Sequence, residues 1–499
     1  MEDEKPEEKL DDLAARLEML LLRQAKGMDQ AELAREAGIS AGQASNYEQA
    51  KAPVRRKTLE KVAGATDFPA SLLGFLHRGI RSFLLVSEGR SRADRALTEV
   101  HALERLAFAR EAADLILAPR TRPSPAAAPP PRAADRETFA APASFFLEGC
   151  TAAEGRLLAE EAAEYQSWVL AEAAAFRSVR EAPNHPREAR EWARLAVYIA
   201  ELVSGEEDWR SCLQGWALHF LANAERACSD LPAAEEALAR GSALWQSGAP
   251  GSPGLLAAAW LPWVEASLRK DQRRFPEALE RIDEALALDR GELRAQILLS
   301  KSNTLRRLDD PQGSTAVLLE AERWIDAERE PRLAFGVRFN LLADLCALGR
   351  AAEAAPRLPG VRTLAEQLGE PLDLTRCLWL QGQIDAGLGR PAEALAAFRQ
   401  VRRDFLELPL PYDHALASLD LSLVLLEEGR TAEVRTVAEE MLAIFKAQGV
   451  SREALAALRV FCEAARQEAA TVEMARQVAR FLRRAQLDPE LRFGEEGAR

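Results

Sequence analysis

A short turn motif recurs at a fixed interval in the C-terminal half of this chain. Gly-Arg, with Glu three residues after the Arg, occurs at Gly349-Arg350 and again 40 and 80 residues later, at Gly389-Arg390 and Gly429-Arg430. Each copy lies between two stretches with the apolar spacing of a helix. A fixed period of this length predicts stacked helical units that each bury an apolar face against the next unit.

Weaker copies of the turn extend the pattern toward the N-terminus, at Ser229-Asp230, Arg273-Arg274 and Asp309-Asp310. A small residue follows several of the turns by five positions, at Ala234, Ala278, Ala354 and Ala394. These features resemble tetratricopeptide repeats, in which two antiparallel helices approach closely at a small residue. The resemblance implies a right-handed solenoid of about six units, with the residues beyond the usual period of about 34 placed in the second helix or in the loop between repeats.

The composition predicts helix almost throughout. Aromatic residues make up 6% of the 499 residues, and runs of valine, isoleucine and threonine are almost absent. An all-α chain of this length needs more than one core. A tract rich in proline and alanine cannot continue a helix and has little apolar bulk, so it is interpreted as a linker. The predicted domains are 7–68 (helix-turn-helix bundle), 69–118 (helical spacer, a candidate dimerisation element), 119–144 (linker), 145–205 (solenoid cap), 206–467 (repeats) and 468–499 (C-terminal capping helix and tail).

Residues 29–48 read as two short helices joined by a glycine turn. Asp29 and Ser40 are suited to cap the two helices, and Gly38 is suited to the positive φ between them. The segment resembles the xenobiotic-response-element class of phage-repressor-like helix-turn-helix domains. An ordinary helical hairpin at the end of a solenoid is the alternative. The resemblance rests on Gln30, Leu33, Ala34, Gly38, Ile39, Ser40, Tyr47, Glu48, Leu59 and Val62.

The resemblance implies which side chains meet DNA. Base-reading positions of the family hold Ala41, Gly42 and Asn46, of which only Asn46 can pair bidentately with adenine. Gln43 is a second polar candidate, so direct base readout is expected to be sparse. The family usually has glycine where Ala50 stands. The basic run 55–57 contacts phosphates in this interpretation, or is simply a solvated loop. The full predicted DNA-binding set is Gln30, Ser40, Ala41, Gly42, Gln43, Ser45, Asn46, Lys51, Arg55 and Arg56.

The concave face of the predicted solenoid is the second candidate site. Amides there can bond a peptide backbone, aromatics can take side chains, and arginines can take carboxylates. Packing between helices is the plainer interpretation for the tryptophans. Asparagine is a mediocre helix former, so asparagines within helices indicate a role beyond helix formation. The predicted partner-binding set is Trp216, His219, Asn223, Arg226, Trp263, Lys270, Asn303, Arg306, Asn340, Arg376, Trp379 and Gln383.

Several functional classes are not expected. The six cysteines have no close pairs, the five histidines never fall at i and i+4, and no phosphate-binding loop or nucleophile elbow is present. We therefore expect no enzyme activity, cofactor, metal or disulfide. The acidic N-terminus and the lack of a long apolar run predict a cytoplasmic, nucleoid-associated protein with no membrane partner. The net charge is −13, yet basic residues outnumber acidic ones between Arg23 and Lys61.

Together these features predict a bacterial transcription regulator. Its N-terminal domain would bind double-stranded DNA as a homodimer, with two recognition helices in successive major grooves about 34 Å apart. Its solenoid would bind a peptide or protein, as in the peptide-sensing regulators that this architecture resembles, and change the dimer or recruit a partner. The rival is a protein interaction scaffold whose helix-turn-helix lacks sequence-specific DNA binding, which Ala41 and Gly42 favour.

Overall fold

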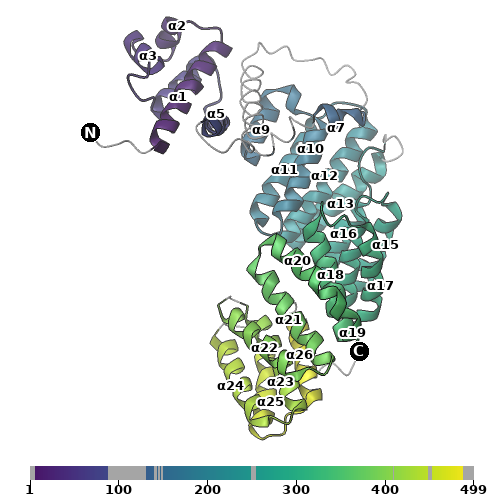
Figure 1. Cartoon of the computed structure of the whole chain (residues 1–499). Helices are drawn as coiled ribbons and strands as arrows, with labels where there is room; N and C mark the ends of the chain where they lie inside the picture. Colours follow the sequence, from purple (N-terminus) through teal and green to yellow (C-terminus); the bar gives the residue numbers. More distant parts are fainter. Residues whose placement is uncertain are drawn as a thin grey trace, which may run out of the picture. The chain divides into compact units, whose positions relative to one another are not determined.

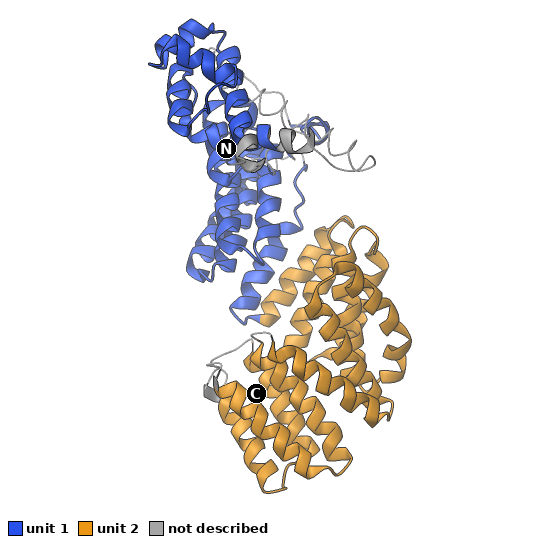
Figure 2. Cartoon of the chain, turned by 60° about the vertical axis from the view of Figure 1, so that its left-hand side comes forward, with its two compact units in different colours: residues 1–274 blue, residues 275–499 orange. Residues whose placement is uncertain are grey.

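A computed structural model describes residues 6–87, 131–139, 143, 147, 150–248, 254–407, 410–447 and 452–486. The chain divides into two compact units, 1–274 and 275–499 (Figure 2). The described residues form α-helices, short 3-10 turns and connecting loops, with no strand among them. The predicted all-α class is therefore confirmed. The predicted spacer beyond residue 87, most of the linker and the tail after residue 486 lie outside the described residues.

The N-terminal part of unit 1 is a small helical bundle. Leu22 of its first helix, Leu33 of its second and Val62 of its fourth are fully buried in a common core. Helices of seven or eight residues are only marginally stable on their own. The short helices of this bundle are therefore held in place by the apolar side chains that every helix buries in the common core. The elements are α1 (Pro6–Ala25), α2 (Gln30–Glu36), α3 (Ala41–Glu48), α4 (Arg56–Thr66), η1 (Ala70–Leu72) and α5 (Leu73–Ser87) (Figure 1).

The rest of unit 1 is a stack of longer helices. Trp192, Trp216 and Phe220 are completely buried within it, and the same hydrophobic cluster includes residues of the N-terminal bundle. Arg78 also forms an ion pair with Glu154, which joins the two parts of the unit. The elements are α7 (Ala134–Thr138), α9 (Ala152–Glu161), η2 (Ala163–Tyr165), α10 (Trp168–Glu181), α11 (Pro186–Leu202), α12 (Glu207–Ala227), α13 (Leu231–Gly248) and α14 (Trp260–Asp271).

Helix α7 corrects the prediction that 119–144 has no structure of its own. Its five residues, ADRET, contain no proline, and Arg136 holds them against α10. The Arg136 guanidinium donates to both oxygens of Glu172, at 2.8 and 2.6 Å, and to the carbonyl of Leu255 at 2.7 Å. The Trp168 indole N–H donates to Asp135 at 3.0 Å. The high proline and alanine content of the whole tract gave no indication of these polar contacts.

Unit 2 consists of successive helical hairpins. Three residues separate α16 from α17 and α21 from α22, which makes the paired helices antiparallel. The predicted C-terminal capping helix, α26, packs on both α25 and α23. The elements are α15 (Phe275–Leu288), α16 (Arg294–Arg307), α17 (Pro311–Ala321), η4 (Glu322–Trp324), α18 (Pro331–Ala347), α19 (Ala351–Ala354), η5 (Ala355–Arg357), α20 (Leu358–Leu368), α21 (Pro371–Gly387), α22 (Pro391–Leu406), α23 (Pro411–Glu427), α24 (Thr431–Ala447), α25 (Arg452–Arg466) and α26 (Val472–Ala485).

The six turns that define the predicted repeats share one backbone conformation. Their first residues all have a positive φ, although only three of the six are glycine. All four small residues that follow the turns are fully buried. The repeat alignment made from the sequence is therefore confirmed at the turns, and the hairpins resemble those of tetratricopeptide proteins. The φ values are 63° at Ser229, 63° at Arg273, 59° at Asp309, 72° at Gly349, 69° at Gly389 and 71° at Gly429.

In the pairs α21–α22 and α23–α24, the extra residues of the repeat lie in the helices. A period of about 34 residues leaves about 14 for each helix once the turns are removed. Helices α21, α22, α23 and α24 have 16 or 17 residues each. The first helix of each pair is therefore lengthened as well as the second, which the sequence analysis did not anticipate.

His414 makes the stability of unit 2 depend on pH. This side chain of α23 is 1% exposed, and neither ring nitrogen has a hydrogen-bond partner among the described residues. Burial, with a smaller contribution from Arg402, lowers the pKa of His414 to about 4. At pH values between 6.5, the ordinary pKa of histidine, and about 4, His414 binds a proton in the unfolded chain but not in the folded chain. Stability that is present above pH 6.5 is therefore lost as the pH falls.

We expect this histidine to cost about 2 kcal/mol of folding free energy on going from pH 8 to pH 5. The measurement is urea unfolding of the full chain and of His414→Leu at both pH values. The variant should lose less stability than the original chain as the pH falls. Equal losses in the two proteins would show that His414 is not the group responsible.

Candidate DNA-binding surface and repeat-region pocket

The helix-turn-helix is held by reciprocal caps at both helix starts. The Asp29 side chain accepts from the Glu32 N–H while the Glu32 side chain accepts from the Asp29 N–H. Ser40 and Gln43 make the same exchange at the start of α3. Gly38 has φ +61° between the two helices. The predicted caps and turn are thus confirmed, and these reciprocal bonds fix the direction in which α3 leaves the turn.

Helix α3 exposes few polar side chains. Ser40, Ala41, Gly42, Gln43 and Asn46 are exposed, whereas Ser45 is half-buried. The Gln43 carbonyl oxygen accepts from the Ser40 N–H at 2.9 Å, so part of its acceptor capacity is used within the protein and its amide nitrogen is the group left fully available for a base. Among the described residues, no group bonds the Asn46 side-chain amide. Asn46 is therefore the side chain on α3 that is best placed to read a base edge.

Gln30 at the start of α2 is already engaged within the protein. Its amide nitrogen donates to Glu48 at 2.8 Å, and Glu48 also accepts from Arg23 at 2.9 Å. This arrangement ties the start of α2 to the end of α3. A phosphate contact by the Gln30 side chain would require its bond to Glu48 to break, whereas the backbone N–H groups at the helix start need no such change.

Basic side chains flank the exposed face of α3. Lys51 and Arg55 lie in the loop after α3 and are exposed. Arg56, at the start of α4, is also exposed and forms a weak ion pair with Glu60 at 3.4 Å. An exposed ion pair of this kind is worth little, so Arg56 can exchange Glu60 for a phosphate at small cost. Exposed cations of this kind are the side chains that can contact phosphates without regard to base sequence.

Ala50 occupies the position where glycine is usual, and the turn is nevertheless kept. Its φ is +61°, in the left-handed region that disfavours a Cβ. We expect Ala50→Gly to raise the stability of the helix-turn-helix by about 0.5 to 1 kcal/mol. The gain is smaller than the strain of a Cβ in the left-handed region, because glycine loses more conformational entropy on folding than alanine does. Thermal unfolding of the full chain checks this expectation. A lower midpoint for Ala50→Gly would contradict the strain assigned to this turn.

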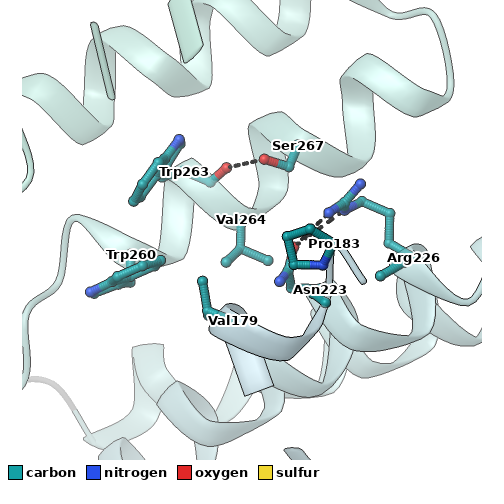
Figure 3. A pocket seen from close by; sticks show the side chains of 10 residues that line it. Val179, Pro183, Asn223, Arg226, Trp260, Trp263, Val264 and Ser267 are labelled. Carbon is teal, nitrogen blue, oxygen red and sulfur yellow. Dashed lines mark hydrogen bonds between the residues drawn. The ribbon is translucent and has the colours of Figure 1, made fainter. Parts of the chain in front are cut away.

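A pocket of about 440 Å³ lies in unit 1 among α10, α12 and α14. Trp260 and Trp263 line one end, and Asn223 and Arg226 line the other (Figure 3). Its volume is in the range of small-molecule and side-chain binding sites. Three of the predicted partner-binding residues, Asn223, Arg226 and Trp263, meet in this pocket. The remaining lining residues are Val179, Ala182, Pro183, Ala227, Trp260, Val264 and Ser267.

Two predicted partner-binding residues on α12 face the core instead. Trp216 is fully buried and donates to the carbonyl of Ala257 at 3.3 Å. His219 is 2% exposed, and its ring nitrogens lie 2.8 Å from the carbonyl of Gly215 and 3.4 Å from the hydroxyl of Ser242. The prediction of a ligand-facing role is wrong for both. Helix α12 packs against other helices on two sides. The polarity and size of a side chain therefore do not show whether it faces the core or the pocket.

The remaining predicted residues lie on the first helices of later hairpins. Asn340 of α18 donates to Asn303 of α16 at 3.2 Å, and Asn303 is exposed. Trp379 and Gln383 of α21 both donate to Asp420 at 2.8 Å. Neighbouring first helices are therefore connected through the same side chains that the sequence analysis assigned to a ligand. Lys270 is half-buried and lies outside the pocket.

The arginines of these helices are paired with carboxylates of the protein itself. Arg226 donates to Asp271 at 2.6 Å, and Arg306 lies 3.2 Å from Asp344, whose side chain is 3% exposed. Arg376 lies 3.9 Å from Asp373. The idea that these arginines offer free positive charge to ligand carboxylates is therefore wrong in this structure. Asp271 and Asp344 were missed because each lies on the next helix pair, whereas Asp373 lies three residues before Arg376 on the same helix.

The wall that α10 gives to the pocket was also missed. Val179 belongs to α10 itself, while Ala182 and Pro183 follow its last turn. The repeat turns begin at Ser229 and 145–205 is predicted as a cap, so no sequence signal points to these residues. Trp260, which begins α14, also lines the pocket.

The described residues contain no group of three or more His, Cys, Asp or Glu side chains that could hold a metal ion. None of the described helices combines the length and the apolar character that crossing a bilayer requires. None of the six cysteines forms a disulfide, and burial raises the pKa of Cys377 and Cys462 to about 11, so these two thiols stay protonated at neutral pH.

The caps, the glycine turn and the exposed second helix define a helix-turn-helix domain. The family model described as helix-turn-helix matches residues 20–73, which covers α2, α3, α4 and the last turns of α1. The N-terminal domain is therefore a helix-turn-helix of the phage-repressor-like class, and the resemblance noted in the sequence is confirmed. Comparison with curated proteins gives no match.

Solved structures of helical repeat proteins resemble the chain more loosely. A Rap protein complexed with competence and sporulation factor is 13% identical, with 64% of this chain and 88% of that chain covered and a TM-score of 0.45. Aspartyl phosphate phosphatase F from Bacillus subtilis is 12% identical, with coverage of 76% and 90% and a TM-score of 0.42. A signal transduction ATPase with a tetratricopeptide repeat sensor from Pyrococcus horikoshii is 12% identical, with coverage of 93% and 72% and a TM-score of 0.48.

Proposed function

We propose that this protein is a transcription regulator without enzyme activity. Its helix-turn-helix binds double-stranded DNA, and its repeat region binds a peptide or protein that alters this binding. The observation that carries the first part is the exposed face of α3, where Asn46 is free to bond a base edge. Lys51, Arg55 and Arg56 flank this face and supply phosphate contacts.

The repeat region supports the second part through its exposed amides. Asn303 and Asn340 lie on adjacent first helices and bond each other, which leaves the Asn303 amide nitrogen available on an exposed surface. An extended peptide offers a carbonyl and an N–H at each residue, and asparagine can bond both. A pull-down with the full chain is expected to lose its partner when both asparagines become alanine while helicity is unchanged. Retained binding would move the site elsewhere.

The rival, a scaffold without sequence-specific DNA binding, has an observation in its favour. Ala41 and Gly42 offer no hydrogen-bonding side chain, and Gln43 uses its carbonyl oxygen to cap α3. Direct readout then rests on a single fully available amide. The scaffold predicts salt-sensitive binding to any DNA, because only phosphate contacts remain.

Replacing Asn46 by alanine distinguishes the two. If Asn46 reads a base, Asn46→Ala costs about 1 to 3 kcal/mol at one base pair and relaxes the sequence preference there. Arg55→Ala is the matched control, since loss of a phosphate contact weakens binding to all sequences alike. Selection of bound sequences from a random DNA pool, with the full chain and both variants, measures the difference. A uniform loss in Asn46→Ala would contradict its role as a base reader.

A further inference from the structure

The pocket among α10, α12 and α14 has a built polar end. Asn223 is 8% exposed, and its side-chain oxygen accepts from Arg226 at 2.9 and 3.3 Å. A guanidinium only donates, so the amide oxygen must face Arg226 and the amide nitrogen must face away from it. Among the described residues, no group accepts a hydrogen bond from that nitrogen. The amide lies at the base of the pocket between Val179 and Arg226 (Figure 3).

The charge at this end is already neutralised. Arg226 donates to Asp271 at 2.6 Å, and its other nitrogens bond Asn223. A ligand carboxylate placed here would have to compete with Asp271 for the guanidinium. A neutral carbonyl needs only the free Asn223 N–H. The polar end therefore favours an uncharged acceptor, such as a main-chain carbonyl, over a carboxylate.

The other end is aromatic and rigidly supported. Trp260 and Trp263 are half-buried, with ring centroids 4.7 Å apart. Trp260 rests against Phe220 at 5.2 Å and Phe176 at 5.7 Å, and both of these rings also contact Trp216 in the core. Val179 and Val264 lie between the aromatic and polar ends (Figure 3). Such a lining favours a large apolar side chain, and an aromatic side chain can make stacked or edge-to-face contacts with the indoles.

We propose that this pocket is the anchor subsite of the repeat region. It accepts one large apolar side chain of a peptide against Trp260 and Trp263, and the adjoining main-chain carbonyl accepts from the Asn223 amide nitrogen. This inference rests on the proposed binding of a peptide by the repeat region. It goes further because it names the recognised group. That group is an apolar residue within the peptide, and the carboxyl group of this residue is in amide form, as in a peptide bond.

Fluorine NMR of the full chain labelled with 5-fluorotryptophan tests the subsite with a defined probe. The probe is N-acetylphenylalaninamide, and the resonances are assigned with Trp260→Phe and Trp263→Phe. The resonances of Trp260 and Trp263 should shift saturably at millimolar probe, while that of Trp324, which is 49% exposed in unit 2, stays fixed. N-acetylglycinamide, which lacks the apolar side chain, should leave both resonances unchanged. N-acetylphenylalanine, with a free carboxylate, should bind more weakly than the amide.

Asn223→Asp is the decisive variant because it keeps the size and the acceptor for Arg226 while it removes the donor. It should weaken binding of the amide probe about fivefold, the equivalent of one hydrogen bond. Ser247→Ala is the matched control, since that exposed hydroxyl of α13 lies outside the pocket and donates within its own helix, to the carbonyl of Leu244. The proposal is overturned if neither tryptophan resonance shifts, if N-acetylglycinamide or the free acid matches the amide, or if Asn223→Asp binds as well as the original chain.

The outcome is separable from that of the proposed function. If the repeat region binds no peptide or protein, the pull-down with the full chain recovers no partner that depends on Asn303 and Asn340. The two tryptophan resonances report on the pocket alone, and they shift or remain fixed whatever the pull-down shows.

Discussion

Gly215→Ala is expected to destabilise unit 1 by about 3 kcal/mol or more. A Cβ at this position of α12 would lie 2.6 Å from the backbone nitrogen of Trp245 and 2.7 Å from the carbonyl oxygen of Gly241, both on α13. Backbone atoms of a packed helix cannot move aside cheaply, so the two helices would have to separate. Because α12 also carries Asn223 and Arg226, the same change should disturb the pocket.

Tryptophan fluorescence during urea unfolding measures this effect, since most of the tryptophans lie in unit 1. Gly64→Ala is the matched control in the same unit. Apart from the backbone of its own helix, no atom of the described residues lies within 4 Å of a Cβ at that position, so this change should be neutral or stabilise the chain by up to about 1 kcal/mol. Equal midpoints for Gly215→Ala and the original chain would show that α12 and α13 are packed less closely than described.

Arg136→Met should cost about 3 kcal/mol, the second large effect. The Glu172 carboxylate is 9% exposed, and Arg136 is the only cation that bonds it among the described residues. Loss of that cation leaves a buried charge without compensation, which costs more than the pair itself contributes. The thermal midpoint of unit 1 should fall by roughly 5 to 10 °C.

The double variant Arg136→Met with Glu172→Met separates charge from packing. It removes both charges and keeps apolar volume at both positions, so it should recover most of the lost stability. Hydrogen exchange over 134–138 gives a local measurement of the same contact, and it should be faster in the single variant. A double variant as unstable as the single one would show that the lost bond to Leu255 or the contact with Trp168, rather than the uncompensated charge, dominates.

Much of the fold could be predicted because its signals are local. The positive φ at Gly349, Gly389 and Gly429 and the caps at Asp29 and Ser40 depend on residues close in sequence. The repeat period also located the turns that lack glycine, and these turns have the same backbone conformation. Helix α7 was missed because Arg136 contacts residues far along the chain, and the composition of a tract carries no information about such contacts.

The candidate sites could be predicted only in part, for a related reason. The sequence placed Asn223 and Trp263 correctly in one region, yet it could not show that Trp216 on the same helix faces the core. It also assigned free charge to Arg226 and Arg306, because the carboxylates that neutralise them lie about 40 residues away on the next hairpin. Burial and charge compensation are properties of the packed structure, and helical periodicity alone does not determine them.

Sequencing of the genomic DNA bound by the intact protein at several salt concentrations tests the proposed function most directly. A transcription regulator should enrich a short, imperfectly palindromic site whose preference persists as salt weakens total binding. In the Asn46→Ala variant, that preference should be lost at one position in each half-site. Binding that falls steeply with salt and enriches no sequence at any concentration would contradict specific regulation and favour the interaction scaffold.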